Sequence, residues 1–534
     1  MIRTIQILVL LLIVIAAIAL VARRLKIPPA ILLVLTGVAL ALVPGLPTLQ
    51  LAPEAVLLLV LPPIIYWSAI SMSWREFQFN LRPISLLAVG CVVFTTLAAA
   101  AATHWLLGMA WPVGFVVGAI ISPPDAVAPL SIARRMQLPR RILVILEGEG
   151  LANDATALIL YRFAVVAVSV GAFSFSRAVG IFGAILAGEI LWGIGIGWLI
   201  LRLRRWVADP RIEITLSILT PFLAYWPPEY LGGSGVLATV TTGLYISWNG
   251  LRLISAATRL QGVFFWDFLI YLLEGMVFLI TGLQARTLVA GMRGYSIADL
   301  AVSAAVVSLV VILARFVWMY PAIYVPRWLS SSLRRRDPAP PWQWPFVLAF
   351  TGVRGIVSLA AALAIPFATD SGSPFPNRDL ILFLTYCVIL VTLVGQGLML
   401  PTLIRWLGLA HAGRREHHAD REAEFVARRL AIEAAMTRLE QLATERKLSE
   451  EILLPLRAYH RDRLTQAERR HDGDEGHKKL TDLHDEIESA LVAAERAQIN
   501  ELYRRGSLKD EARRRIEREL DLREAQLDNL RAEE

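Results

Sequence analysis

Thirteen apolar runs, each about as long as a bilayer is thick when it coils into a helix, constrain this chain more than any other feature. Charged or Pro/Gly-rich joints separate the runs. Backbone groups inside lipid must be bonded within the protein, so runs of this kind fold as helices. The sequence therefore predicts an all-α membrane protein with about 13 transmembrane helices, at approximately residues 5–22, 29–45, 52–70, 84–108, 112–131, 142–170, 178–201, 213–228, 232–248, 263–285, 297–325, 343–367 and 380–408.

Charge divides the chain into two parts. Residues 1–410 carry 28 Lys and Arg against 16 Asp and Glu, whereas residues 411–534 carry 25 against 29. The first part is predicted to be a transmembrane domain, and its basic surplus suits contact with anionic membrane lipid without requiring nucleic acid. The second part is predicted to be a cytoplasmic helical tail, because apolar residues recur in it every three or four positions.

The tail offers no sign of catalysis. HDGDEGHKK, at 471–479, predicts a break between its helices. We interpret the tail as a solvated appendage or dimerisation element rather than a catalytic domain, and a regulator of unknown kind could bind it. His417 and His418 lack partners at ligand spacing, so no metal site is expected there. Cys91 and Cys387, the two cysteines of the chain, exclude a disulfide framework.

Positive charge alternates from joint to joint. One set of joints carries 22 Lys and Arg, and the other carries five. The positive-inside rule places the rich set in the cytoplasm, which puts the N-terminus outside and the C-terminus inside, as an odd number of spans requires. Arg23, Arg24 and Lys26 follow the first run, which favours a retained span over a cleaved signal peptide. We therefore expect a multi-pass protein of a bacterial-type cytoplasmic membrane.

The fifth run contains ISPPDAV, at 121–127, which a continuous helix accommodates poorly. Pro123 and Pro124 lack backbone donors and disfavour helical geometry in the residues before them, so the segment from Ser122 to Asp125 is expected to unwind. A simple kink is the alternative. An unwound segment with an intramembrane carboxylate favours an ion site, to which Ser122 could add an oxygen.

The sixth run concentrates polar groups in EGEGLANDA, at 147–155. Glu149 and Asn153 are four residues apart and share a helix face, while Asp154 lies about 100° further round. For Asn153 alone, a hydrogen bond between helices would be the simpler explanation. With both carboxylates beside it, the wall of a polar site is favoured.

The twelfth run, in FTGVRGIVSLAAALAIP, repeats this pattern of a weak helix with one buried charge. Gly352 and Gly355 bracket Arg354, which is predicted, together with Arg315 of the eleventh run, to pair with Glu149 without titrating. The fifth and twelfth spans cross the membrane in opposite senses. Their placement predicts inverted six-span repeats, spans 1–6 and 8–13, that meet at two broken helices.

These features predict exchange of ions. Asp125 and Asp154 in one cavity can bind either a proton or a small alkali cation, and such mutually exclusive occupancy produces antiport. A cation channel or sensor controlled by the tail is the alternative from another class, although no carbonyl-filter repeat is present. An enzyme is not expected, because the sequence has no nucleophile–base pair or phosphate loop.

Residues 121–165, ISPPDAVAPLSIARRMQLPRRILVILEGEGLANDATALILYRFAV, strongly resemble the monovalent cation:proton antiporter-1 family, the bacterial sodium/proton antiporters related to animal sodium/proton exchangers. The resemblance covers about residues 1–410, in order. Further matches are WREFQFNLRPI at 74–84, IEITLSILTPFLAY at 212–225, SGVLATVTTGLY at 234–245, VFLITGLQ at 277–284 and TGVRGIVSLAAALAIP at 351–366.

The resemblance implies a homodimer of thirteen-span subunits with crossed broken helices, transporting Na⁺, or alternatively Li⁺ or K⁺, against H⁺ and using no cofactor. By position, Asp154 and Asp125 resemble the family's ion-binding aspartates, and Asn153 the neighbouring asparagine associated with electroneutral exchange. Glu149 resembles the glutamate that pairs with arginines, here Arg354 and Arg315.

The chain also departs from the family pattern. Trp67, with Ser68 beside it, stands where many relatives have a cation-binding acid after the two prolines of span three. Gly150 stands where a serine is common. Glu189 and Glu274 match no family role, and an interhelical hydrogen bond of a protonated acid is the simplest explanation for each.

Overall fold

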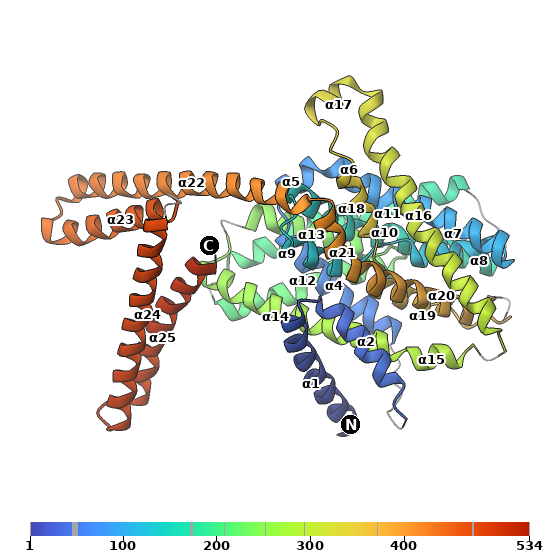
Figure 1. Cartoon of the computed structure of the whole chain (residues 1–534), viewed down its shortest axis with the longest axis horizontal. Helices are drawn as coiled ribbons and strands as arrows, with labels where there is room; N and C mark the ends of the chain where they lie inside the picture. The colour runs from blue at the N-terminus through green and yellow to red at the C-terminus, as the bar shows by residue number, and fades with distance from the viewer. Residues whose placement is uncertain are drawn as a thin grey trace. The chain divides into compact units, whose positions relative to one another are not determined.

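The computed structural model describes residues 2–44, 52–170, 175–207, 209–250, 253–292, 294–370, 372–471 and 475–532. It divides into two compact units, Met1–Arg414 and Arg415–Glu534. Both units are built from helices, and the described residues contain only one isolated β-bridge, between Ala368 and Pro374 (Figure 1).

The helices of the first unit follow the predicted apolar runs. Where α-helix passes into a π-helical stretch within one span, the stretch is labelled η. The elements are α1 (Ile2–Leu25), α2 (Pro29–Ala41), α3 (Pro53–Ala55), η1 (Val56–Val60), α4 (Leu61–Ser71), α5 (Trp74–Phe79), α6 (Leu81–Ser85), η2 (Leu86–Cys91), α7 (Val92–Leu107), α8 (Trp111–Ile121), α9 (Val127–Arg135), α10 (Arg140–Val170), α11 (Phe175–Arg204), α12 (Pro210–Tyr230), α13 (Val236–Asn249), α14 (Ala256–Leu283), α15 (Ala285–Ala290), α16 (Ile297–Leu329), α17 (Ser331–Arg336), α18 (Gln343–Phe350), α19 (Ile356–Leu363), α20 (Arg378–Leu390), η4 (Val391–Gln396) and α21 (Gly397–Trp406).

Eight helical stretches of the described residues are long and apolar enough to cross a membrane. Two shorter apolar helices are α2 and α8. Helix also covers the remaining predicted runs, as α12, α13 and the pair α18 and α19. The eight stretches are Gln6–Leu25, Pro53–Ser71, Leu81–Leu107, Arg140–Ser169, Val179–Arg204, Ala257–Ala290, Ile297–Leu329 and Arg378–Trp406.

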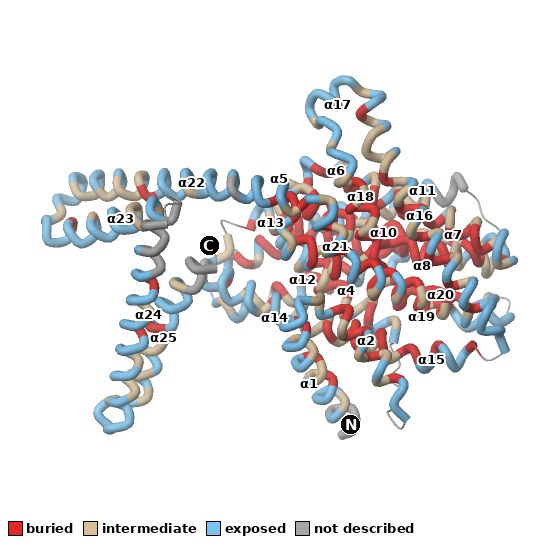
Figure 2. The backbone as a smooth tube through the Cα atoms, viewed as in Figure 1, coloured by how far each residue is buried: buried red, intermediate tan, exposed pale blue. Residues whose placement is uncertain are grey.

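Small residues allow some of these helices to approach closely. Gly37 of α2 lies against Gly282 of α14, and a Cβ built on Gly37 would be 2.8 Å from the Gly282 Cα. Water cannot drive helices together inside lipid, so close packing of small residues becomes the main attraction between them. Figure 2 shows the result, with buried residues gathered where α4, α8, α10 and α13 pack inside the unit.

The second unit consists largely of exposed helices. Its elements are the greater part of α22 (Leu409–Arg446), then α23 (Glu450–His471), α24 (Glu475–Arg504) and α25 (Asp510–Ala532). Ion pairs join α24 to α25, where Arg496 binds Asp521 at 2.9 Å and Arg523 binds Glu495 at 3.2 Å. Of the predicted break at 471–479, residues 472–474 lie outside the described part of the chain, between the end of α23 and the start of α24.

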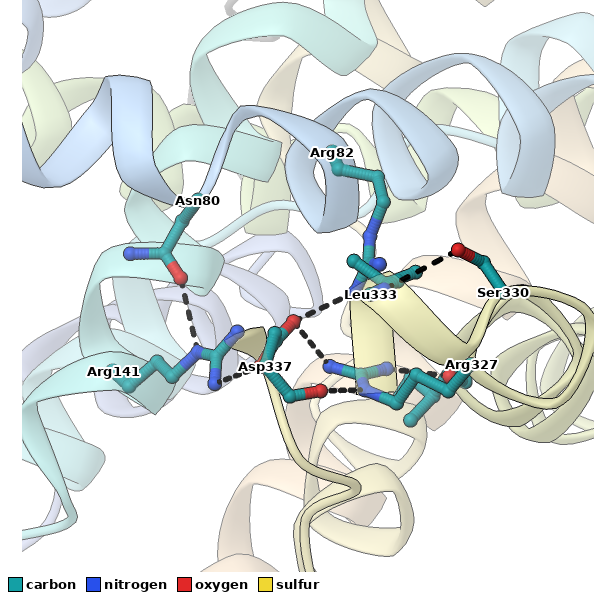
Figure 3. A network of polar contacts seen from close by, with 8 residues as sticks. Asn80, Arg82, Arg141, Arg327, Ser330, Leu333 and Asp337 are labelled. Carbon is teal, nitrogen blue, oxygen red and sulfur yellow. Dashed lines mark hydrogen bonds and ion pairs between the residues drawn. The ribbon is translucent and has the colours of Figure 1, made fainter. Parts of the chain in front are cut away.

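Three arginines near the ends of long apolar helices anchor Asp337, in the loop between α16 and α18 (Figure 3). The Asp337 carboxylate accepts hydrogen bonds from Arg82 at 2.8 Å, Arg141 at 2.8 Å and Arg327 at 2.7 Å. Burial alone would raise the pKa of Asp337, but the hydrogen bonds and charges of the three arginines outweigh it and hold the pKa below its ordinary value. The loop that leads into α18 is thereby fixed to α6 and α10.

Candidate functional site

Two of the predicted spans are interrupted in the middle. Helix α8 ends at Ile121 and α9 begins at Val127, while α18 ends at Phe350 and α19 begins at Ile356. Prolines account for the first interruption, because they remove donors and disfavour helical geometry in the residues before them. The second interruption lies in TGVRG, where glycine weakens helix formation.

The two interruptions cross and bond to one another. The Asp125 backbone N–H donates to the Val353 carbonyl at 2.7 Å, and Arg354 Nε donates to the Ile121 carbonyl at 2.6 Å. Each broken helix therefore satisfies backbone groups that the other exposes. Irregular backbone survives at membrane depth only when it is buried in protein in this way or lines a cavity.

Asp125 occupies the centre of the crossing. Its Oδ1 accepts a hydrogen bond from the Val127 N–H at 2.9 Å, at the start of α9. Gly355 passes so close that a Cβ at this position would overlap the Asp125 carboxylate. A side chain at 355 would therefore displace the aspartate.

The neighbouring wall comes from α10. The Asn153 side-chain amide donates to the Pro124 carbonyl at 2.6 Å, which fastens α10 to the first interruption. Its Oδ1 is buried and has no partner among the described residues. Gly150 is also constrained here, because a Cβ would lie 2.9 Å from the Ala126 Cβ. A serine at this position would require α10 and this break to separate slightly.

Glu149 and Arg315 form an ion pair in the interior of the protein. Both are almost completely buried, and the guanidinium binds both carboxylate oxygens. Arg315 Nε also donates to the Leu348 carbonyl at 3.0 Å. A buried pair of this kind is held by fixed hydrogen bonds, and breaking it leaves an uncompensated charge.

Arg354 differs from the expectation that it shares Glu149 with Arg315. Its guanidinium donates hydrogen bonds to the carbonyls of Ile121 and Gly352. Its backbone N–H donates to the Thr392 hydroxyl oxygen at 2.9 Å. The planar guanidinium suits this task, since it presents several donors in a fixed geometry to the carbonyls of the broken helices. The residue therefore connects the two interruptions by hydrogen bonds, while its charge also interacts with that of Glu149.

Asp125 and Asp154 line one cavity of about 420 Å³. Pro123 and Pro124 also line it, whereas Ser122 is not among its lining residues. The Ser122 hydroxyl donates back to the Ala119 carbonyl at 3.2 Å, which continues the bonding of α8. Of the predicted ion-binding group, the cavity therefore brings together the two aspartates.

The sequence did not single out Asp267, and it assigned Glu274 no role, yet both line this cavity from α14. Asp267 accepts a hydrogen bond from the Trp67 indole N–H at 3.0 Å. The available signal was their spacing, since residues seven apart lie on one helix face. Trp67 and Ser68 line the same cavity.

At the edge of the cavity Arg134 forms an ion pair with Glu147. Arg134 belongs to the positively charged joint between the fifth and sixth runs, which the charge bias predicts to be cytoplasmic, and Glu147 lies in the sixth run. Apart from Arg134, the lining contains no Lys, Arg or His among the described residues. The interior of the cavity is therefore acidic.

Glu189 forms hydrogen bonds to a neighbouring helix, as the sequence suggested, and its partners are mainly backbone groups. Its carboxylate accepts hydrogen bonds from the backbone N–H groups of Ser234 at 2.6 Å, Gly235 at 3.3 Å and Leu237 at 3.1 Å. These N–H groups belong to the start of α13, which favours negative charge. Glu189 of α11 thus caps a neighbouring helix.

Known exchangers and antiporters match most of the chain. An uncharacterised Na⁺/H⁺ exchanger of Mycobacterium tuberculosis strain H37Rv is 34% identical over 516 residues, which cover 95% of this chain and 93% of the relative. A sodium, potassium, lithium and rubidium/H⁺ antiporter of Bacillus pumilus is 34% identical over 389 residues, or 71% of this chain and 58% of the relative.

The fold is also found in a solved structure, that of the sodium proton antiporter MjNhaP1 from Methanocaldococcus jannaschii. It matches with a TM-score of 0.61 and 19% identity, covering 76% of this chain and 99% of that chain. The transmembrane region that defines sodium/hydrogen exchangers matches residues 9–406. These matches confirm the family that the motifs predicted: the chain belongs to the sodium/hydrogen exchanger family.

Proposed function

We propose that this protein is a secondary active antiporter that exchanges a monovalent cation for H⁺ by alternating access around Asp125 and Asp154. The observation that carries the proposal is the cavity in which these two aspartates meet at the crossing of two broken helices. A carboxylate that holds a proton has lost the charge that attracts a cation. Competition for one pair of carboxylates couples the two ions in opposite directions.

The other groups of the site hold its geometry. The Glu149–Arg315 pair and the Arg354 contacts hold the crossing in place. Asn153 is neutral and positions the first break through the Pro124 carbonyl. With an asparagine beside Asp154, we propose one-for-one, electroneutral exchange.

We propose thirteen spans arranged as two inverted six-span repeats, with the N-terminus outside and the C-terminus in the cytoplasm. Helix over every predicted run and the alternation of charged joints support this topology. The Arg134–Glu147 pair at the edge of the cavity then marks its cytoplasmic opening. In this conformation the aspartates would be reached from the inside.

We further propose a homodimer in the cytoplasmic membrane, with residues 1–410 as the exchanger domain and residues 411–534 as a cytoplasmic tail that binds a regulator. The division of the chain after Arg414 supports a separate tail. The channel or sensor alternative receives no support from the relatives, whose names describe exchangers and antiporters.

Na⁺ is the proposed cation, with Li⁺ and K⁺ as the alternatives to be measured. The protein in proteoliposomes should dissipate an imposed pH gradient when one of these cations is added. Asp154→Asn should abolish exchange, because an amide neither releases a proton nor attracts a cation with a full charge. Glu189→Gln, outside the cavity, is the comparison variant and should still exchange once its folding is verified.

Two results would contradict the proposal. A parent protein that dissipates no gradient with any of the three cations is not this exchanger, and unchanged exchange by Asp154→Asn would place the site elsewhere. Electroneutrality is checked in the same vesicles by imposing a membrane potential, which should leave the exchange rate unchanged.

A further inference from the structure

The wall that α14 contributes to the cavity carries carboxylates of its own. Asp267 and Glu274 are seven residues apart, so they lie on one face of the helix, and both line the cavity that contains Asp125 and Asp154. The two acids have different surroundings. Asp267 is exposed and binds the Trp67 indole, whereas no hydrogen bond or ion pair to Glu274 occurs among the described residues.

A second polar group without a partner lines the same cavity. The Ser358 side chain, on α19, is 1% exposed, and its hydroxyl oxygen has no hydrogen-bond partner among the described residues. Buried hydroxyls are almost always bonded, so an unbonded one at a cavity wall can be satisfied by a water or an ion. Hydroxyl and carboxylate oxygens are the ligands that hard cations prefer.

The charges of the cavity favour a cation beside Glu274. Glu274 lies close enough to Asp125 for their charges to interact, and Asp125 acts in the same way on Asp154. Arg134, the one basic side chain of the described lining, is already paired with Glu147. Acidic clefts with low-dielectric walls concentrate cations.

These acids do not form a resident metal centre. No group of three or more Asp, Glu, His or Cys residues in the described ranges is arranged to hold a metal ion. Glu274 is therefore placed for a passing cation that carries part of its water shell, rather than for a tightly held one.

We infer that Glu274 is a further cation-binding residue, at which the Glu274 carboxylate and the Ser358 hydroxyl hold the monovalent cation as it moves between the cavity mouth and the two aspartates. This inference rests on the proposed exchange function. It gives α14 a part in cation selection and gives Glu274 a role that the sequence did not suggest.

The test is Glu274→Gln in proteoliposomes, with the initial rate measured over a series of Na⁺ concentrations. The half-saturating Na⁺ concentration should rise about tenfold while the maximal rate falls much less, because uniform binding is lost rather than the exchange step. The same measurement with Li⁺ and K⁺ should show a change in the order of preference.

A binding measurement separates this inference from the exchange proposal. Na⁺ should raise the Tm of the purified parent relative to choline, since a ligand that binds the folded state stabilises it. Glu274→Gln should lose most of that rise. Glu54→Gln, the same change at an exposed position of α3, is the matched control and should retain it.

An unchanged half-saturating concentration together with an unchanged Tm rise in Glu274→Gln would overturn the role of Glu274, even if Asp154→Asn is inactive. If the parent protein shows no exchange, the proposed function is overturned. That outcome is distinct from a failure of the Glu274 inference, in which the parent exchanges and Glu274→Gln behaves like it. If Glu274→Gln does not fold, Glu274→Asp decides the question. This variant keeps the carboxylate but shortens the side chain by one methylene group. An unchanged half-saturating Na⁺ concentration would show that the Glu274 carboxylate does not bind the cation.

Discussion

The two interrupted spans differ in the residues that break the helix and in the charge that each break carries. Prolines open the first, and the charge it carries, on Asp125, faces a cavity. Glycines open the second, and its charged residue, Arg354, donates hydrogen bonds to backbone carbonyls of both spans. The comparison teaches that one break presents a carboxylate to the cavity, while the other holds the surrounding backbone in place.

The largest effect is expected where the two breaks touch. In Gly355→Ala the new Cβ overlaps the Asp125 carboxylate, so the aspartate or the second break must move. We expect exchange to fall below about one hundredth of the parent rate, because displacements near 1 Å at a reacting group cost factors of this size. Initial rates in proteoliposomes, normalised to folded protein, measure the loss.

Gly372→Ala provides a control for Gly355→Ala, since a Cβ at 372 meets no atom within 4 Å and lies outside the crossing. Because Gly372 has a positive φ, an alanine there is expected to lower the stability modestly, but it should leave the exchange rate unchanged. Parent-like transport by Gly355→Ala would show that the contact between the breaks is not needed.

The next effect concerns the fixed charges. Glu149→Gln leaves the Arg315 guanidinium buried without its anion, which should lower the free energy of unfolding by about 3–5 kcal/mol. Thermal unfolding in detergent measures it as a lower Tm. Replacing both members, Glu149→Leu with Arg315→Met, should recover much of the loss, and a double variant less stable than the single one would argue against a purely structural pair.

The smallest effect is expected at the loop that leads to the glycine break. Asp337→Asn weakens three arginine contacts at a partly exposed site, so we expect a loss of about 1 kcal/mol at neutral pH. Because the pKa of Asp337 is lowered in the folded state, its contribution is complete above the unfolded pKa of about 4 and disappears as pH falls through the lowered value. The difference in Tm between parent and variant should therefore shrink in acid. A constant difference down to strongly acidic pH would contradict this account.

The sequence predicted much of the framework, because apolar length and proline position act locally. Runs such as 142–170 and 297–325 became helices near the expected limits, and the segment after Ile121 unwinds as the prolines predict. Asp125 and Asp154, from the fifth and sixth runs, were expected in one cavity, and both line it.

The failures share one physical cause. The partners of Arg354, the cap that Glu189 gives to α13 and the lining role of Glu274 all depend on which helices become neighbours. Spacing along one helix says which residues share a face, but not what that face meets. Asp267 was missed for this reason, since its partner Trp67 lies two hundred residues away.

The reciprocal bonds between Asp125 and Val353, and between Arg354 and Ile121, limit how this protein can move. Sliding one broken span past the other would leave these groups unmatched in a dry interior, at a cost of several kcal/mol. In the proposed alternating access, the two spans would therefore move as one rigid body. The cavity walls supplied by α4 and α14 would then be the surface along which that body slides.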